Sequence, residues 1–177
     1  MAVNRYAKDY RLVESVDEKG RLRASAEYIG ADYYFTSGSA AARTAARRCA
    51  IFCALSWTGQ LAAFLPQSLA MRRLWSSLPA AFSVLPLWLL SAAVITALRA
   101  KEPLQRREAE TLSSRVPAAA VFTALLSGAA FFAALFSLLY SGSGMLPGDL
   151  CFLGGELVIA VCALLCFRKR NALTAAV

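Results

Sequence analysis

The sequence predicts an all-α membrane protein with four transmembrane helices in an antiparallel bundle and a small cytoplasmic N-terminal β-hairpin element. Hydrophobic residues make up 58% of the 177-residue chain, which is too apolar for one soluble domain of that length. An apolar run covers residues 49–98 and is about twice the roughly 20 residues that span a bilayer. Two shorter apolar runs follow at residues 116–140 and 150–167. Together these runs predict four membrane-crossing segments.

The polar residues 1–48 predict a cytoplasmic segment without a cleaved signal peptide. Residues 10–16 and 21–29 alternate partly between apolar and polar on either side of a turn, where Gly20 supplies the positive φ of a tight hairpin. Residues 32–36 are expected to add a third strand. Three short strands bury too little apolar surface to fold alone. We therefore expect them to lie on the membrane surface or on the cytoplasmic ends of the helices.

A juxtamembrane helix is expected at the Ala/Arg-rich residues 40–48, and it should run directly into the transmembrane domain of residues 49–167. Arg72-Arg73 interrupts the first apolar run. Because two charges are costly in hydrocarbon, this pair predicts the turn between the first two helices. Pro86 lies near the middle of the second helix and predicts a kink, since proline lacks a backbone N–H. The four expected helices are approximately residues 49–69, 74–98, 116–140 and 150–167.

The connecting segments differ in charge, and this asymmetry predicts the orientation. Residues 99–115 form an expected loop with five basic residues, and the basic tail of residues 168–177 begins with three more. The turn at residues 141–149 has none. Since basic residues concentrate in cytoplasmic loops, we expect both termini in the cytoplasm. The predicted location is the cell inner (plasma) membrane, and the high Ala, Leu and Arg usage is compatible with a bacterial source.

The composition also excludes several classes of function. The chain has no histidine, which removes the commonest general base and the commonest metal ligand. Its net charge of +8 comes largely from residues that flank apolar runs, so it indicates lipid headgroups rather than nucleic acid as the partner. No P-loop, paired carboxylates or nucleophile arrangement is present. The sequence leaves enzymatic activity open but favours a non-enzymatic protein, and no cofactor is expected.

Glu156 is the most informative residue, because an ionisable side chain six residues into the fourth expected helix is costly unless it is paired or protonated. Counted from the cytoplasmic helix ends, Gln60 and Glu156 both lie about 16 Å deep at 1.5 Å per residue. This common depth predicts a hydrogen bond between antiparallel first and fourth helices. The alternatives are a purely structural glutamate that holds two helices together and one that reaches the outer headgroups.

Helical spacing places small and polar residues on one face of the first helix, which predicts contact with protein or water rather than lipid. Ser56, Gln60 and Gln67 lie on this face and, with Glu156, are the candidate residues of an ion or substrate pathway. The third helix has a ridge of small residues that repeats every four positions and predicts close helix packing. Its members are Ala120, Ala124 and Gly128.

Four of the five cysteines form two pairs, Cys49 with Cys53 and Cys162 with Cys166, at the expected inner ends of the first and fourth helices. If those helices are neighbours, the four thiols share one layer and become weak candidates for a metal site or a thiol switch. However, C-x₃-C is not a standard zinc or redox spacing, and cysteine packs well as a small apolar residue. The sequence therefore favours packing for these thiols.

Three functions fit these observations. The favoured one is a non-enzymatic accessory or scaffold subunit of a membrane complex, because no catalytic set is visible. The first alternative is a homo-oligomeric channel or small transporter with a polar seam of Gln60 and Glu156. The second is a membrane thiol or metal protein that uses the cysteine layer. The expected partners are the lipid bilayer and either further copies of the chain or another membrane protein.

Overall fold

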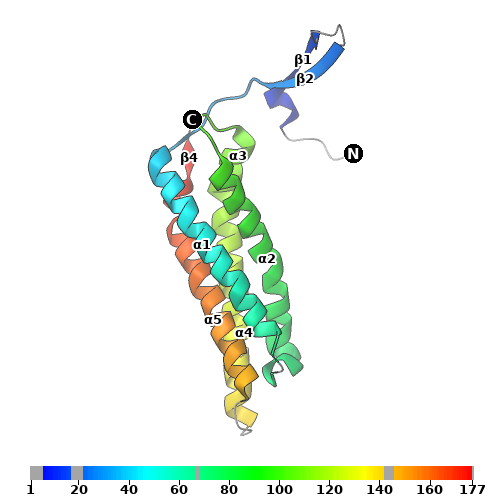
Figure 1. The fold of residues 1–177 in the computed structure, drawn as a ribbon, viewed down its shortest axis with the longest axis vertical. Coiled ribbons are helices and arrows are strands. Elements are labelled where there is room, and N and C mark those ends of the chain that lie inside the picture. The colour runs from blue at the N-terminus through cyan, green and yellow to red at the C-terminus, as the bar shows by residue number, and fades with distance from the viewer. Residues whose placement is uncertain (1–5, 17–21, 67, 142–145, 177) are drawn as a thin grey trace.

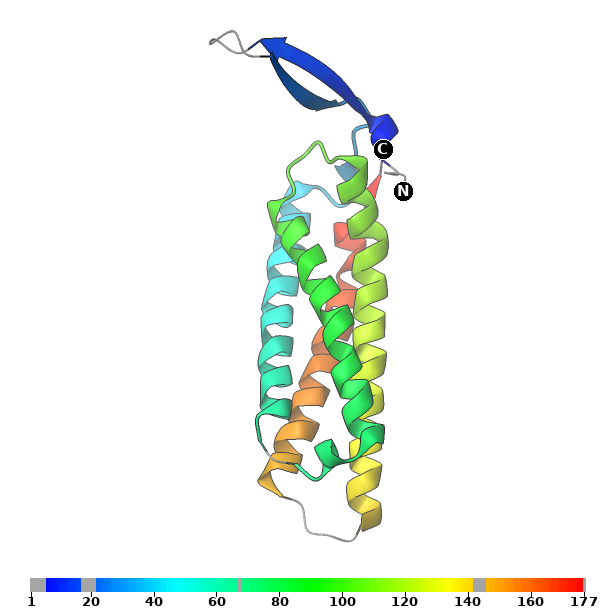
Figure 2. The same cartoon turned by 90° about the vertical axis from the view of Figure 1, so that its right-hand side faces the viewer.

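The computed structural model describes residues 6–16, 22–66, 68–141 and 146–176, and the protein is mostly helical (Figure 1). Within these residues four long helices lie side by side in an elongated bundle (Figures 1 and 2). A short helix, α3, and a π-helical turn, η3, extend α4 beyond the bundle at one end. The helices are η1 Ala7–Asp9, α1 Ser39–Phe64, η2 Ala70–Arg72, α2 Leu74–Arg99, α3 Arg106–Glu110, η3 Thr111–Arg115, α4 Val116–Ser141, α5 Pro147–Arg168 and α6 Arg170–Leu173.

Three helical segments in the described part of the chain are long and apolar enough to cross a membrane: α2, the continuous helix Arg106–Tyr140, and α5. The prediction of four spanning helices is therefore not confirmed. The exception is α1, which begins at Ser39 and includes the expected juxtamembrane helix with its arginines. It ends at Phe64 rather than near residue 69, and Gln60 interrupts its apolar half. α1 is thus a long helix with a short apolar portion.

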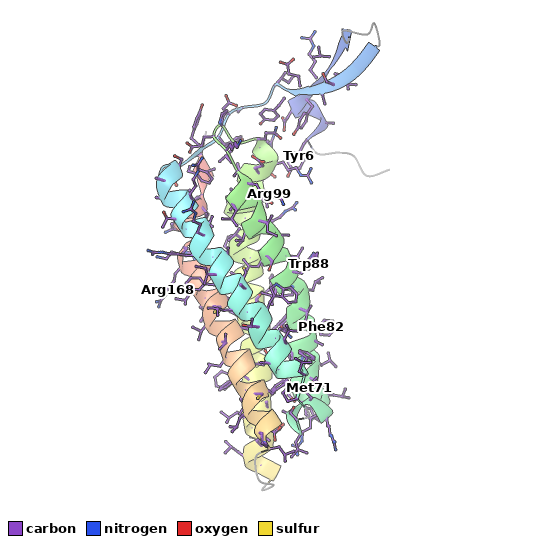
Figure 3. All side chains as sticks on the ribbon, in the orientation of Figure 1. Tyr6, Met71, Phe82, Trp88, Arg99 and Arg168 are labelled. Atoms are coloured by element: carbon purple, nitrogen blue, oxygen red, sulfur yellow. The ribbon has the colours of Figure 1, made fainter. Side chains whose placement is uncertain are left out.

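The bundle is apolar on its outside and small or polar on its inside. Ile51, Phe82 and Trp88 are 59%, 60% and 64% exposed, and Figure 3 shows the last two projecting from the outer face of α2. The inside is built largely from alanine, with leucine and cysteine at one end. Among the described residues it also contains ten that are polar or charged and buried: Ser56, Gln60, Ser68, Ser76, Ser83, Thr123, Ser127, Ser137, Asp149 and Glu156.

The predicted β-hairpin is present. β1 (Tyr10–Val16) pairs antiparallel with β2 (Leu22–Tyr28), and the expected turn at Gly20 lies outside the described residues. The hairpin projects beyond the helix ends (Figure 2). Its base is fixed to α3 because the Tyr10 hydroxyl donates a hydrogen bond to Gln105 Oε1 at 2.6 Å, and the Tyr28 hydroxyl accepts one from the Arg106 backbone N–H at 3.0 Å.

The expected third strand does not join the hairpin. β3 is only Tyr34–Phe35, and it pairs antiparallel with β4 (Ala175–Ala176) from the C-terminal tail. The tail is therefore not a free basic extension: Leu173 is fully buried, and the Thr174 carbonyl accepts hydrogen bonds from the Thr36 N–H and hydroxyl. The apolar residues that follow the basic stop of α5 supply this packing surface.

The expected charged loop at residues 99–115 is helical from Arg106 onward. This segment is rich in Arg, Glu and Ala, which favour helix. An Arg106–Glu110 ion pair with a nitrogen–oxygen distance of 3.1 Å adds support at the i,i+4 spacing. The outcome is a helical extension of α4 rather than an irregular loop.

A glycine contact brings α1 and α5 close together. A Cβ added to Gly155 would clash with the Gly59 carbonyl oxygen and would lie 3.0 Å from Ala63 Cβ. A Cβ added to Gly59 would lie 3.0 Å from the Gly155 carbonyl oxygen. By contrast, a Cβ on the adjacent Gly154 meets nothing within 4 Å. Glycine at position 155 therefore permits this close approach of the two backbones, and a side chain at position 59 would be tightly confined.

We expect Gly155→Ala to lower the free energy of unfolding by about 1–3 kcal/mol, the usual cost of overpacking a tight contact. The matched control is Gly154→Ala, which should be neutral or stabilise by up to about 1 kcal/mol because alanine favours helix. The measurement is thermal unfolding of the detergent-solubilised protein. Equal melting temperatures for the two variants would contradict the close contact.

Candidate functional site

Glu156 lies on α5 and faces the inside of the bundle, where its side chain is completely buried. Neither carboxyl oxygen has a hydrogen-bond partner among the described residues. The polar group beside it is the Ser127 hydroxyl of α4, which lies near enough to interact but forms no hydrogen bond and is itself unpaired. An unpaired polar group at such a position is costly. Glu156 and Ser127 together are therefore two buried polar groups without hydrogen-bond partners among the described residues.

Gln60 lies at the same level of the bundle, since its neighbour Gly59 touches Gly155. Its side chain, however, turns toward α2. The Gln60 Nε2 group donates to the Ala80 carbonyl at 3.3 Å, and the Ser83 hydroxyl donates to Gln60 Oε1 at 3.4 Å. The predicted Gln60–Glu156 hydrogen bond is therefore wrong. Helix length predicts the common depth of Gln60 and Glu156, but the rotation of each helix about its own axis directs the two side chains to different neighbours.

The other candidate pathway residues do not converge on Glu156. Ser56 is buried, and its hydroxyl donates to the Phe52 carbonyl of its own helix at 2.9 Å. Gln67 lies outside the described residues. The structure thus brings Gln60 together with α2 and Glu156 together with α4, and it does not form one continuous polar seam.

The paired cysteines do come together. Cys49, Cys53, Cys162 and Cys166 are all buried where α1 meets α5, and Cys166 Sγ lies 3.8 Å from the Cys49 carbonyl oxygen. Within the described residues no group of three or more cysteine or carboxylate side chains is arranged so that it could hold a metal ion. The contacts are those of small side chains that fill a narrow helix interface.

The predicted small-residue ridge of α4 is only partly at an interface. Ala120 is fully buried, whereas Ala124 and Gly128 are half-buried, and a Cβ on Gly128 would meet nothing within 4 Å. The buried line of α4 instead follows a mean spacing near 3.5 residues. It passes through Ala120, Thr123, Ser127, Ala130, Ala134 and Ser137.

Asp149 is important for the structure, although the sequence alone predicts that it lies in a turn. It is fully buried in the first turn of α5. Its Oδ1 accepts from the Ala70 N–H at 3.1 Å, and its Oδ2 accepts from the Leu146 N–H at 3.0 Å. Asp149 therefore caps α5 and binds it to η2. The signal was available, because proline followed two residues later by an acid is typical of a helix start.

No protein-family model, no curated protein and no solved structure matches the chain. The arrangement of the side chains is therefore the basis for the proposed function. Among the described residues, Asp149 at one end of the bundle and Gln60 in its middle are buried polar side chains that bond between elements. Glu156 and Ser127 differ, since neither side chain has a hydrogen-bond partner among the described residues.

We expect Glu156→Leu to leave the melting temperature unchanged or to raise it, because it removes an unpaired buried carboxyl group that costs about 1–3 kcal/mol. Gln60→Leu should lower the free energy of unfolding by about 1 kcal/mol, because it breaks the bond to the Ala80 carbonyl. Thermal unfolding in detergent measures both. A loss with Glu156→Leu as large as that with Gln60→Leu would show that the carboxyl group has a partner after all.

Proposed function

We propose that this chain is a multi-pass integral membrane protein in which α1 crosses the bilayer together with the three more apolar helices. The support is the inverted distribution of side chains, with large apolar groups outside and small or polar groups inside. A membrane bundle packs in this way because lipid tails solvate large side chains while small residues let helices approach. On α1 itself Ile51, Leu55 and Leu61 are exposed at 59%, 46% and 59%.

The proposed orientation has the hairpin, α3 and the C-terminal strand in the cytoplasm. Tyr6 and Arg99 lie at this end in Figure 3, and the label of the C-terminus lies there in Figure 1. Met71, beside Arg72, lies at the opposite end. Four crossings bring both ends of a chain to the same side of the membrane. The hairpin end carries more Lys and Arg than the opposite end, and this excess favours a cytoplasmic location for the hairpin end.

The function that the geometry supports best is a non-enzymatic accessory or scaffold subunit of a membrane complex. The observation that carries this proposal is the hairpin. A two-stranded hairpin is marginal on its own, yet this one projects from the bundle with both outer edges unpaired among the described residues. Leu12, on β1, is 76% exposed. An exposed strand edge is a standard place for a partner to add a strand.

The pore alternative receives less support. Glu156 and Gln60 are 0% and 5% exposed, and both face the inside of a single protomer. A pore formed between copies of the chain would leave them outside the conducting path. The surface available for such a pore is dominated by large apolar side chains, which suit lipid.

The test replaces residues 10–28 by a Gly/Ser linker of equal length and compares native masses after mild detergent extraction. We expect the unaltered 19.0 kDa chain to run in a larger complex that contains another protein, and the variant to run alone while staying in the membrane fraction. Gly154→Ala serves as the control and should keep the complex. A homo-oligomer that survives the replacement, or a monomer in both cases, would contradict the accessory function.

The orientation has its own test by cysteine labelling in whole cells, on a Cys151→Ser background because Cys151 is exposed. Ser143→Cys should react with a membrane-impermeant reagent, and Lys101→Cys should react only after the cells are opened. The reverse pattern would place both termini outside.

A further inference from the structure

A cavity at the hairpin end lies between α2 and the continuous helix of α3, η3 and α4, which run side by side (Figure 2). Its volume is about 560 Å³. Small side chains create the hollow, since Ala92 and Ala93 of α2 face Ala118 and Ala119 of the opposite helix. The space is not filled by any other element of the described chain.

The cavity is apolar at one end and charged at the other. Its inner end is lined by Pro86, Leu89 and Phe122, and its outer rim carries Arg107 and Arg115. Because α2 and α4 are antiparallel, the stretch from Thr96 to Pro86 runs beside the stretch from Arg115 to Phe122. At 1.5 Å per residue the first stretch covers about 15 Å and the second about 10 Å. The lining of the cavity therefore changes from charged to apolar side chains along the bundle axis.

The two rim arginines are exposed, and neither forms an ion pair with a described residue. Arg106 differs, because it is paired with Glu110 at 3.1 Å and with Asp9 at 3.8 Å. Glu108 is the one acid among the residues that line the cavity, so the rim carries a net positive charge. Gln105, Thr111 and Tyr10 add hydrogen-bonding groups to the same rim.

The rim also contains the π-helical turn Thr111–Arg115. Such turns are rare and are often found at functional sites, because they shift the register of the side chains that follow. Here the turn ends on Arg115, one of the two rim arginines that form no ion pair with a described residue.

We propose that this cavity binds an anionic phospholipid of the cytoplasmic leaflet, with its phosphate between Arg107 and Arg115 and one acyl chain along Pro86, Leu89 and Phe122. The assignment rests on the proposed membrane location and orientation. A phosphate group suits guanidinium donors, and basic residues at the cytoplasmic surface attract anionic lipids. The apolar inner end of the cavity accepts the acyl chain. A free phosphate or another soluble anion would leave this apolar end unoccupied.

The experiment uses the full chain in a mild neutral detergent and measures the melting temperature during titration with phosphatidylglycerol, phosphatidylcholine or inorganic phosphate. We expect phosphatidylglycerol to stabilise the protein at concentrations at least tenfold lower than phosphatidylcholine, and inorganic phosphate to have no effect. Equal effects of the two lipids would overturn the proposal. Stabilisation by phosphate alone would also overturn it, since the acyl chain would then have no role.

Two variants locate the site. The double variant R107Q R115Q should lose the preference for phosphatidylglycerol, while the control R99Q R168Q, with the same charge change at exposed arginines that do not line the cavity, should keep it. Ala118→Trp should fill the hollow and weaken binding of both lipids. Equal losses in R107Q R115Q and its control would overturn the site in favour of general surface charge.

Failure of this proposal is distinguishable from failure of the membrane proposal. If the chain is recovered without detergent after alkaline washing of membranes, the membrane location is wrong. If it stays in the membrane and responds equally to both lipids, only the lipid site is wrong.

Discussion

The contact between Gly59 and Gly155 is the constraint on which the bundle depends. It brings the backbones of α1 and α5 together without intervening side chains, and it therefore fixes the rotation of both helices. Gln60 follows Gly59 and is directed to α2, where it bonds to the Ala80 carbonyl. Glu156 follows Gly155 and is directed to α4, beside Ser127. One close contact thus separates two polar side chains that lie at the same level.

The buried hydroxyl groups show how polar side chains inside the bundle find hydrogen-bond partners. Ser56 bonds to the Phe52 carbonyl, and Thr123 bonds to the Ala119 carbonyl, each one turn back on its own helix. These bonds remove the cost of a buried hydroxyl without requiring a partner helix. Hydroxyl groups can therefore line small-residue interfaces without fixing the helix arrangement, whereas Asp149 and Gln60 bond between elements and do fix it.

The hairpin end of the bundle is a small layer of its own rather than a set of loose tails. β3 pairs with β4, and Tyr33 forms a bridge with Leu104, so segments from three parts of the chain close over the bundle. Tyr10 belongs to the hairpin, bonds to Gln105 and also lines the cavity between α2 and α4. The proposed partner surface and the proposed lipid site therefore meet at one residue.

The sequence by itself determined the helical class, the hairpin and the positions of the apolar segments, because these follow from local composition and periodicity. It also placed Gln60 and Glu156 at a common depth, since depth depends only on the rise per residue. Only the tertiary structure decided where their side chains point, that β3 pairs with the C-terminal tail, and that the close contact lies at Gly59 and Gly155 rather than at Gly128. Helix rotation and long-range strand pairing depend on which surfaces of the elements pack together. The local sequence of one strand or helix does not specify which other element it will contact.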